Sequence, residues 1–477
     1  MSLPKPLVRE LPLLLAPEQL FSLFLADYCS FWLDSSLPGG RMGRFSFMGS
    51  NPFLYFKTYG NTALVEESGR LTSFRERPFR MLRELLARFR TEPGELPFLA
   101  GAVGFFSYDL GRMTEKLPDL TADDLNVPDI CLGFYDRVLV IDHEAHRLYL
   151  SATGLPLAGA TAKAKALADL DELAGRIVAA GTAPDSDPWL GPKVSAGEIS
   201  RCFTESAYRQ AVLKAKEYIA AGDIYQVNVT QRFSAPLKTT PYQLYRRLRQ
   251  ASPAPFAAYL DCSDDLRLLS SSPERFLLLR DGQVETRPIK GTRPRGRTAE
   301  EDRERRRELL ASEKDRAELV MIVDLERNDL GRVCSYGTVR VPELLTLEEY
   351  ATVFHLVSTV CGALAPGKDV VDLLKSTFPG GSITGAPKIR AMEIIEELEP
   401  VRRGVYTGAI GYLGFDGRAD LNIAIRTMVN KGDHVYLQVG GGIVADSDPR
   451  LEYEETLHKA RGMLKSLGVD RFPEEEI

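Results

Sequence analysis

Apolar residues at helical spacing predict a series of amphipathic helices along the chain. Pro17 is followed by apolar Leu20 and Phe21, which predicts a helix that begins at Pro17. Thr204 is the expected N-cap of another helix, and Gly222 is its expected stop. Helical spacing or composition predicts helices over residues 79–90, 158–180, 204–222, 299–323 and 451–467.

Shorter runs with alternating or β-branched apolar residues predict strands, many of them joined by tight turns. Asp281 and Gly282 form the turn of one predicted hairpin. Hairpin-connected strands with helices inserted between groups are typical of an α+β fold with antiparallel sheets. The predicted strands cover residues 44–48, 101–109, 136–150, 224–233, 256–260, 266–270, 275–280, 283–287, 404–415 and 434–444.

One connection divides the chain into two expected regions. Residues 181–197 are rich in glycine, proline, serine and aspartate, a composition typical of an exposed linker. We therefore expect an N-terminal region over residues 1–190 and a second region over residues 198–470.

Composition excludes several classes of protein. Hydrophobic content of 44% and charged content of 26% are those of an ordinary globular protein, and a net charge of -6 argues against a nucleic-acid binder. The six cysteines are scattered, with no CxxC pair, which favours reduced thiols over a disulfide framework or zinc site. Prolines and acids interrupt the apolar stretch 11–33, so no membrane span is expected there. We expect a cytoplasmic protein without nucleic-acid or membrane partners.

The segment 285–296, ETRPIKGTRPRG, is unusually cationic. Five positive side chains and no acid lie between Arg287 and Arg297, and the prolines and glycines are expected to keep the segment out of regular strands or helices. Such a loop suits an anionic ligand, although a solvated basic loop is the alternative. Lys290 is a candidate nucleophile, because flanking arginines would destabilise its ammonium form and favour the free amine.

Two acidic pairs share the same helical spacing. Asp315 and Glu318 lie three residues apart in one predicted helix, and Glu452 and Glu455 do so in another. If the two helix faces meet, their carboxylates would form an oxygen-rich site for Mg²⁺, completed by water and an anionic substrate. The alternative is two solvated charged surfaces.

Two glycine-containing segments could approach an anionic ligand. In the segment 380–388, GGSITGAPK, Thr384 is the expected cap and Pro387 the first-turn residue of a helix whose free N–H groups would bind a carboxylate. The glycines at 440–442 would allow close approach of backbone to a ligand. Either segment could instead be a simple turn.

Two further side chains are candidates for proton transfer. His355 lies in an apolar segment, 350–360, that we expect to be helical, where a buried core histidine is the alternative to a catalytic one. Glu274 begins a strand that leads through a hairpin toward Lys290, and an ion pair with a neighbouring arginine is its alternative role.

Eight short motifs occur in a fixed order along the chain, and together they resemble the chorismate-utilising enzymes. The resemblance is densest between about residues 200 and 470. It implies one large α+β fold, in which two antiparallel β-sheets pack as a sandwich with helices outside, and a Mg²⁺-dependent site for chorismate. The motifs are SPERF (272–276), PIKGTRPR (288–295), Glu318 with DLERND (324–329), FHLVS (354–358), GAPK (385–388), YTG (406–408), IRT (425–427) and GGGIVADS (440–447).

The resemblance also implies a ligand set. Glu318 and Glu455 fall at the positions of the family's Mg²⁺ ligands, and Asp315 and Glu452 fall where the family's acids bind the metal through water. The ring carboxylate of chorismate would bind the metal, and its second carboxylate would bind an arginine, which is a favourable pairing of charges. The implied substrate-binding residues are Gly291, Thr292, Ser382, Tyr406, Arg426, Gly441, Gly442 and Lys459.

Position 290 discriminates between reactions within the family. Members that aminate chorismate at C4 carry lysine there, as this chain does, whereas those that form anthranilate usually carry alanine. Isochorismate-forming members use a lysine at the position of Gln226. The resemblance therefore implies formation of 4-amino-4-deoxychorismate, with Lys290 as nucleophile, Glu274 as acid, assistance from His355 and ammonia from a separate glutamine amidotransferase subunit. Anthranilate formation and a non-catalytic ligand sensor are the alternatives.

A second pocket is implied in the N-terminal part. The segments 33–36 and 253–256 match a tryptophan pocket of the family, which would include Ser35, Pro255 and Phe256. Asp34 stands where the feedback-regulated members carry glutamate, and this difference argues against regulation by tryptophan.

Overall fold

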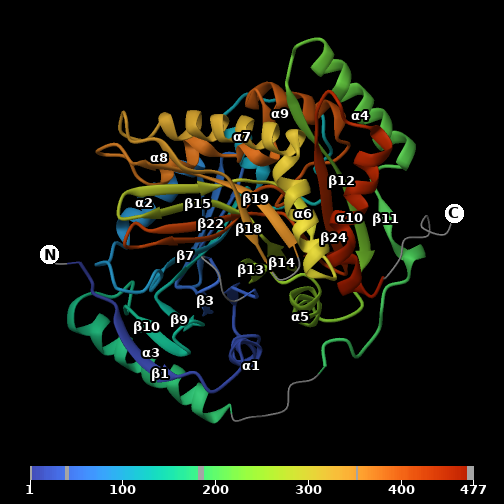
Figure 1. Cartoon of the computed structure of the whole chain (residues 1–477). Helices are drawn as coiled ribbons and strands as arrows, with labels where there is room; N and C mark the ends of the chain where they lie inside the picture. The colour runs from blue at the N-terminus through green and yellow to red at the C-terminus, as the bar shows by residue number, and fades with distance from the viewer. Residues whose placement is uncertain (1–2, 38–41, 181–186, 351–352, 470–477) are drawn as a thin grey trace.

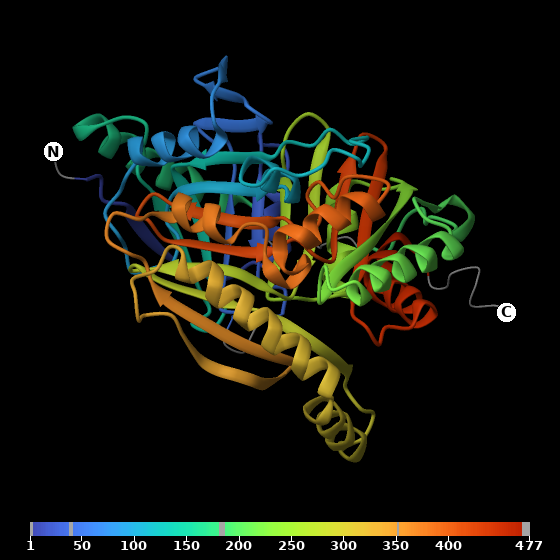
Figure 2. The same cartoon turned by 90° about the horizontal axis from the view of Figure 1, so that it is seen from above.

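Two large antiparallel β-sheets pack face to face in the computed structural model, which describes residues 3–37, 42–180, 187–350 and 353–469. Figure 1 shows the sheets with helices arranged around them, and Figure 2 shows the same arrangement from above. Buried side chains of both sheets, such as Phe47 and Val140 of the first and Phe105 and Tyr412 of the second, form one core between them. The predicted sandwich with outer helices is confirmed.

The first sheet runs through strands from both predicted regions of the chain. In spatial order its strands are β1 (Leu7–Pro12), β10 (Arg147–Ala152), β9 (Arg137–Asp142), β3 (Phe45–Gly49), β2 (Phe31–Asp34), β13 (Phe256–Asp261), β14 (Leu266–Ser272), β23 (Thr427–Lys431), β24 (His434–Ile443), β12 (Gln226–Pro236) and β11 (Ser200–Arg201), with β20 (Gly385–Ala386) beside β12.

The second sheet is built in the same way. Its order is β17 (Ile289–Pro294), β19 (Val353–Ala363), β16 (Gln283–Arg287), β15 (Arg275–Arg280), β22 (Ala419–Ile423), β21 (Ala409–Gly414), β7 (Gly101–Phe106), β8 (Ile130–Tyr135), β4 (Leu54–Tyr59), β5 (Thr62–Glu67) and β6 (Arg70–Arg75), with β18 (Arg340–Glu349) beside β19. The pairs β2–β13 and β7–β21 join residues before position 190 to residues after 198. Both regions therefore share both sheets.

Helices cover the outer faces. Buried residues of α3, α4, α5, α9 and α10 pack into the core of the first sheet, and those of α2, α7 and α8 pack into that of the second. No described helix is long and apolar enough to cross a membrane. The helices are α1 (Pro17–Ser22), α2 (Pro78–Arg88), α3 (Gly159–Ala179), α4 (Glu205–Ala220), α5 (Pro241–Ala251), α6 (Ala299–Ala311), α7 (Glu313–Gly331), α8 (Val370–Thr377), α9 (Lys388–Leu398) and α10 (Pro449–Leu467), with 3-10 turns η1 (Tyr108–Met113), η2 (Ala196–Glu198) and η3 (Gly381–Ile383).

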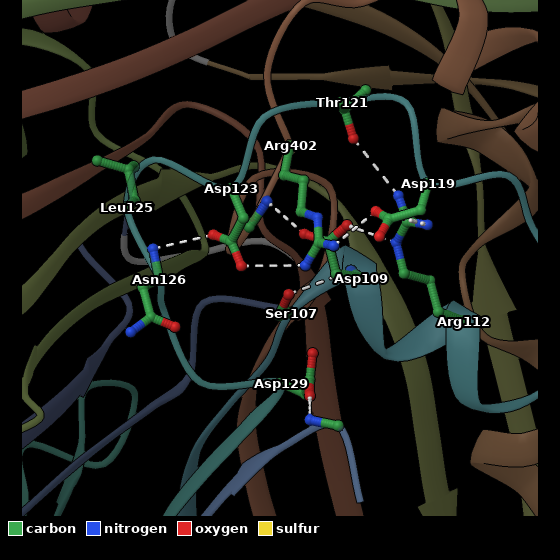
Figure 3. A network of polar contacts seen from close by, with 12 residues as sticks. Ser107, Asp109, Arg112, Asp119, Thr121, Asp123, Leu125, Asn126, Asp129 and Arg402 are labelled. Atoms are coloured by element: carbon green, nitrogen blue, oxygen red, sulfur yellow. Dashed lines mark hydrogen bonds and ion pairs between the residues drawn. The ribbon is translucent and has the colours of Figure 1, made fainter.

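A polar network fastens the connection between β7 and β8 to the segment that follows α9 (Figure 3). Arg402 donates to Asp119 over 2.8 Å and to Asp123 over 3.0 Å. The Asp109 carboxylate accepts the backbone N–H of Gly404 over 2.9 Å. These contacts hold the short turn that presents Tyr406, one of the predicted substrate-binding residues.

Several local predictions are confirmed. A helix begins at Pro17, the Thr204 hydroxyl accepts the N–H of Ala207 over 3.1 Å, and the Asp281–Gly282 turn joins β15 to β16. Gly222 follows the end of α4 with φ of +82°, a conformation that favours glycine. All six cysteines are free thiols.

Two predictions around the cationic segment are wrong. The segment is not an irregular loop, because it contains the end of β16 and all of β17. Pro288 lies between these strands and Pro294 ends β17, so neither proline interrupts a strand interior. The expected helix over residues 299–323 is two helices that meet at Ser312, whose hydroxyl accepts the N–H of Asp315 and caps α7.

Two predictions about the later motifs are also wrong. His355 lies in β19, not in a helix. Residues 354–360 of this strand are all buried, so it lacks the alternation that identifies a strand with one exposed face. Thr384 does not cap α9, because Pro387 occupies the N-cap position and the Thr384 hydroxyl donates instead to the carbonyl of Gly380 over 3.1 Å.

Candidate active site

Lys290 lies where the second sheet meets α7. β17 carries Lys290 and pairs with β19, and α7 packs against both strands. The Lys290 Nζ atom is 3.9 Å from Oε2 of Glu318, and the lysine side chain is largely buried. A primary amine is therefore fixed beside a carboxylate.

Glu274 lies at the turn between β14 and β15, within electrostatic reach of Lys290. Its Oε1 accepts a hydrogen bond of 2.7 Å from the Ser382 hydroxyl. Burial raises the pKa of Glu274 to about 7, although the hydrogen bond from Ser382 and the charges of Lys290 and Lys459 pull in the opposite direction. A carboxyl group with this pKa can give or accept a proton near neutral pH.

His355 is a buried, neutral imidazole near neutral pH. Burial, reinforced by the charge of Arg426, lowers the pKa of His355 to about 3. Its Nδ1 atom is 2.9 Å from the Thr292 hydroxyl, its neighbour in the register of β17 and β19. His355 can therefore orient Thr292 or accept a proton transiently, but it does not carry a resting charge.

Arg426 is a partly buried residue whose guanidinium has no carboxylate partner among the described residues. Burial alone accounts for the lowering of its pKa, and no acidic side chain offsets that effect. Its φ of +49° is unusual for a side-chain-bearing residue and is held in the turn between β22 and β23. A partly buried arginine without an acidic partner is suited to bind an anionic ligand.

Arg403 was not singled out from the sequence, yet it connects several parts of the site. Its guanidinium pairs with Glu399 and donates to the carbonyls of Ile383 and Asn228, both over 2.9 Å. It thereby fixes η3, which carries Ser382, against β12. The sequence gives little indication of this role, because Asn228 and Ile383, whose carbonyls Arg403 contacts, are far from Arg403 in the chain.

The predicted acids come together from two helices. Burial raises the pKa of Glu318, and the neighbouring charges of Asp315 and Glu452 act in the same direction. Burial also raises the pKa of Glu455, but the Lys459 ammonium, 2.6 Å away, brings it below its ordinary value. The Glu318 and Glu452 faces of α7 and α10 therefore meet.

The predicted Mg²⁺ ligands do not form a complete cation site on their own in the described part of the chain. At Gly441 a Cβ atom would lie 3.1 Å from Oε2 of Glu452 and 3.7 Å from Oε1 of Glu455, so glycine keeps the space before the carboxylates open. Within the described ranges, no three acidic, histidine or cysteine side chains could hold a metal ion. Water and an anionic substrate would therefore have to supply further ligands. Lys314, 3.4 Å from Glu452, was missed by the sequence reasoning.

The arginines of the cationic segment do not act on Lys290 as the sequence suggested. Arg287 is paired with Glu348, and Arg295 is paired with Asp302. Arg293 binds Glu308 over 2.9 Å and Asp315 over 3.1 Å. These guanidinium groups thus form ion pairs with carboxylates. The carboxylate paired with the Lys290 amine is that of Glu318.

Two buried amides next to Gly442 were also not predicted as ligand contacts. Both side-chain polar atoms of Gln226 and the Oδ1 atom of Asn228 lack a hydrogen-bond partner within the described part of the chain. Any Cβ at position 442 would lie 2.2 Å from Nε2 of Gln226. Buried amides without partners are costly unless a ligand or water satisfies them, so Gln226 is available to a bound polar molecule.

A separate cavity of about 390 Å³ lies between the sheets. Its lining includes Ser35, Pro255 and Phe256, the residues of the predicted tryptophan pocket. The volume is in the range of small-molecule sites. Asp34 also lines it, but the Asp34 carboxylate is already paired with Arg249 and accepts the Tyr245 hydroxyl over 2.9 Å.

Known proteins match this chain over most of its length. Residues 30–465 match the family described as chorismate binding enzyme. The chain is 42% identical over 433 residues to aminodeoxychorismate synthase component 1 of Bacillus subtilis (strain 168), covering 90% of this chain and 91% of that protein. It is 44% identical over 442 residues to anthranilate synthase component 1 of Thermus thermophilus, covering 92% of each.

A solved structure gives the same result. Anthranilate synthase component I from Streptococcus pneumoniae TIGR4 superposes with a TM-score of 0.77 at 33% identity, covering 89% of this chain and 93% of that one. The two-sheet sandwich and the match to the family model identify an enzyme of the chorismate-utilising class. The chain belongs to the chorismate binding enzyme family.

Proposed function

We propose that this enzyme aminates chorismate at C4 to form 4-amino-4-deoxychorismate, with ammonia from a separate glutamine amidotransferase subunit. The observation that carries the proposal is the placement of Lys290, a primary amine within reach of both Glu274 and Glu318. The relatives named component 1 of a synthase support the separate subunit. The biosynthetic product would serve p-aminobenzoate and folate formation.

In the proposed mechanism, the Lys290 amine adds to ring C2 of chorismate. The ring double-bond electrons shift, the C4–O bond breaks, and Glu274 gives its proton to the departing hydroxyl, which leaves as water. Ammonia then adds at C4, the double bond shifts back, and the C2–N bond to Lys290 breaks. The proton lost by the incoming nitrogen returns to Glu274, whose pKa of about 7 suits both directions.

Other residues would bind the substrate and orient the reacting groups. Arg426 and Tyr406 would hold the enolpyruvyl carboxylate, and the backbone at Gly441 and Gly442 would approach the substrate closely. Mg²⁺, bound by Glu318 and Glu455 and through water by Asp315 and Glu452, would neutralise the ring carboxylate. His355 would orient Thr292, over the 2.9 Å contact, beside the nucleophile.

Anthranilate formation is the second candidate, because relatives with that name match at similar identity. Lys290 favours amination at C4, since an amine at this position offers a nucleophile. Identification of the product from chorismate, Mg²⁺ and ammonium decides between the two. Aminodeoxychorismate retains the enolpyruvyl group, whereas anthranilate has lost it, and no turnover would support a non-catalytic ligand-binding role.

Replacement of Arg426 by glutamine is expected to weaken chorismate binding without weakening the fold. The guanidinium is partly buried and has no carboxylate partner among the described residues, so its loss removes an uncompensated charge. Loss of a charged contact to the substrate carboxylate should raise the KM for chorismate about 100-fold. Steady-state kinetics and thermal unfolding measure the two effects. A lower Tm with an unchanged KM would contradict the assignment.

A further inference from the structure

A large groove lies along α7, and Lys290 is not among the residues that line it. Its volume is about 940 Å³, and it extends to α8 and α9. Exposed Tyr225 and Ile389 lie in its wall together with charged Lys375 and Lys388. The mechanism above assigns no role to this groove.

A much smaller cavity lies directly beneath one wall of the groove. Asp329 lines both spaces, and Lys388 holds this carboxylate in an ion pair while donating to the carbonyl of Thr377 over 2.9 Å. The cavity leaves about 10 Å³ for the centre of a water-sized molecule. This is room for about one such molecule.

Glu326 is a buried acidic side chain that lines the small cavity. The side chain is 7% exposed, and its Oε2 accepts the Thr286 hydroxyl over 2.7 Å. Its other carboxylate oxygen has no donor, and the carboxylate no cationic partner, within the described part of the chain. Burial raises the pKa of Glu326 to about 8, and the charges of Glu274 and Asp329 act in the same direction. A carboxyl group with a free oxygen, mostly protonated at neutral pH, thus faces a water-sized space.

The small cavity is also adjacent to the catalytic acid. Gly381 lines the cavity, and the next residue, Ser382, donates to Glu274 over 2.7 Å. Phe276, two residues after Glu274, forms another part of the cavity wall. Two walls of the small cavity, at η3 and at the start of β15, are therefore adjacent in the chain to Ser382 and Glu274.

We propose that the Glu326 cavity is an ammonium-binding site through which ammonia passes from the groove to Glu274 and Lys290. This inference rests on the proposed amination. Ammonium is a cation about the size of water with four N–H donors, and Glu326, Asp329 and Thr377 offer oxygen acceptors around the space. Ammonium would bind the ionised form of Glu326, and transfer of one proton to that carboxylate leaves neutral ammonia and a carboxylic acid, which must release the proton before the next ammonium binds. Ammonia then continues to C4 of the substrate.

Glu326→Gln and Glu326→Leu test the proposed site in the full-length protein, with ammonium chloride as the sole nitrogen donor and chorismate and Mg²⁺ present. Loss of a charged hydrogen-bond acceptor should raise the KM for ammonium about tenfold or more, with the KM for chorismate unchanged. Glu304→Gln is the matched control, because Glu304 is exposed on α6 and pairs with Arg307. It should leave both constants unchanged.

Two patterns would overturn the ammonium site. One is an unchanged KM for ammonium in both Glu326 variants, and the other is a parallel loss for ammonium and chorismate, which indicates a structural role. Thr286→Val provides a second variant that keeps the side-chain shape and should raise the KM for ammonium alone. The product of the wild-type enzyme tests the proposed function separately, because a different aminated product leaves the ammonium test intact.

Discussion

Lys290→Ala is expected to lower the rate of 4-amino-4-deoxychorismate formation by about three orders of magnitude or more, because it removes the proposed nucleophile. The lysine is held 3.9 Å from Glu318, so its loss also removes a positive charge from the acid cluster. Initial rates with chorismate, Mg²⁺ and ammonium measure the loss. Mass spectrometry of the wild-type protein during turnover should detect a covalent adduct at Lys290 that the variant lacks.

Lys290→Arg is the matched control, since it separates the charge of the lysine from its nucleophilicity. The guanidinium keeps a positive charge near Glu318 but is a poor nucleophile, because it remains protonated. Arginine should therefore be as inactive as alanine. A wild-type rate in either variant would show that Lys290 is not the nucleophile, and recovery in the arginine variant alone would show that only its charge matters.

The fold could be predicted well from the sequence because many of its helix caps and turns are determined by residues close together in the chain. The cap at Thr204 and the hairpin at Asp281 and Gly282 depend on residues within a few positions, and both occur as expected. His355 was placed in the wrong element for the opposite reason. Burial of β19 is set by α7 and the neighbouring strands, which removes the alternation on which the strand assignment depends.

Candidate site residues could be chosen from motifs, but their charge pairing and pKa values could not be predicted. The arginine at 287 looked available for an anion, yet its partner Glu348 is 61 positions away and joins it only in the folded sheet. Glu326 stood out in the sequence only as part of the DLERND motif, and its burial beside Thr286 and a small cavity is a result of tertiary packing. Charge pairing across tertiary contacts is therefore the information that local patterns lack.

Glu274→Gln is expected to lower kcat/KM for chorismate by about 100-fold to 10,000-fold, the range for loss of a general acid or base. Glutamine keeps the side-chain shape and can still accept the Ser382 hydroxyl, but it cannot donate the proton that the leaving hydroxyl needs. In the wild-type enzyme, the pKa of about 7 predicts that the acid-dependent step weakens as pH rises above about 7. The pH profile of kcat/KM should lose this limb in the variant. If the pH profile of kcat/KM were unchanged in the variant, the decrease above pH 7 would have to come from a group other than Glu274.

The same substitution should change the pH dependence of stability in a defined direction. The folded protein binds the Glu274 proton more tightly than the unfolded chain, because burial raises the pKa from its ordinary value of 4.5 to about 7. The free energy of unfolding therefore falls as pH rises between these values, by about 3 kcal/mol at most from this group. Glutamine does not titrate, so the Glu274→Gln variant lacks this pH-dependent fall in the free energy of unfolding. Relative to wild type, its free energy of unfolding should therefore be higher above pH 7 and not higher below pH 4. Denaturant unfolding at both pH values measures the difference, and an equal change at both would mean that Glu274 does not titrate in this range. Stability gained where activity is lost is the expected signature of a carboxyl group held in a costly environment for its proton chemistry.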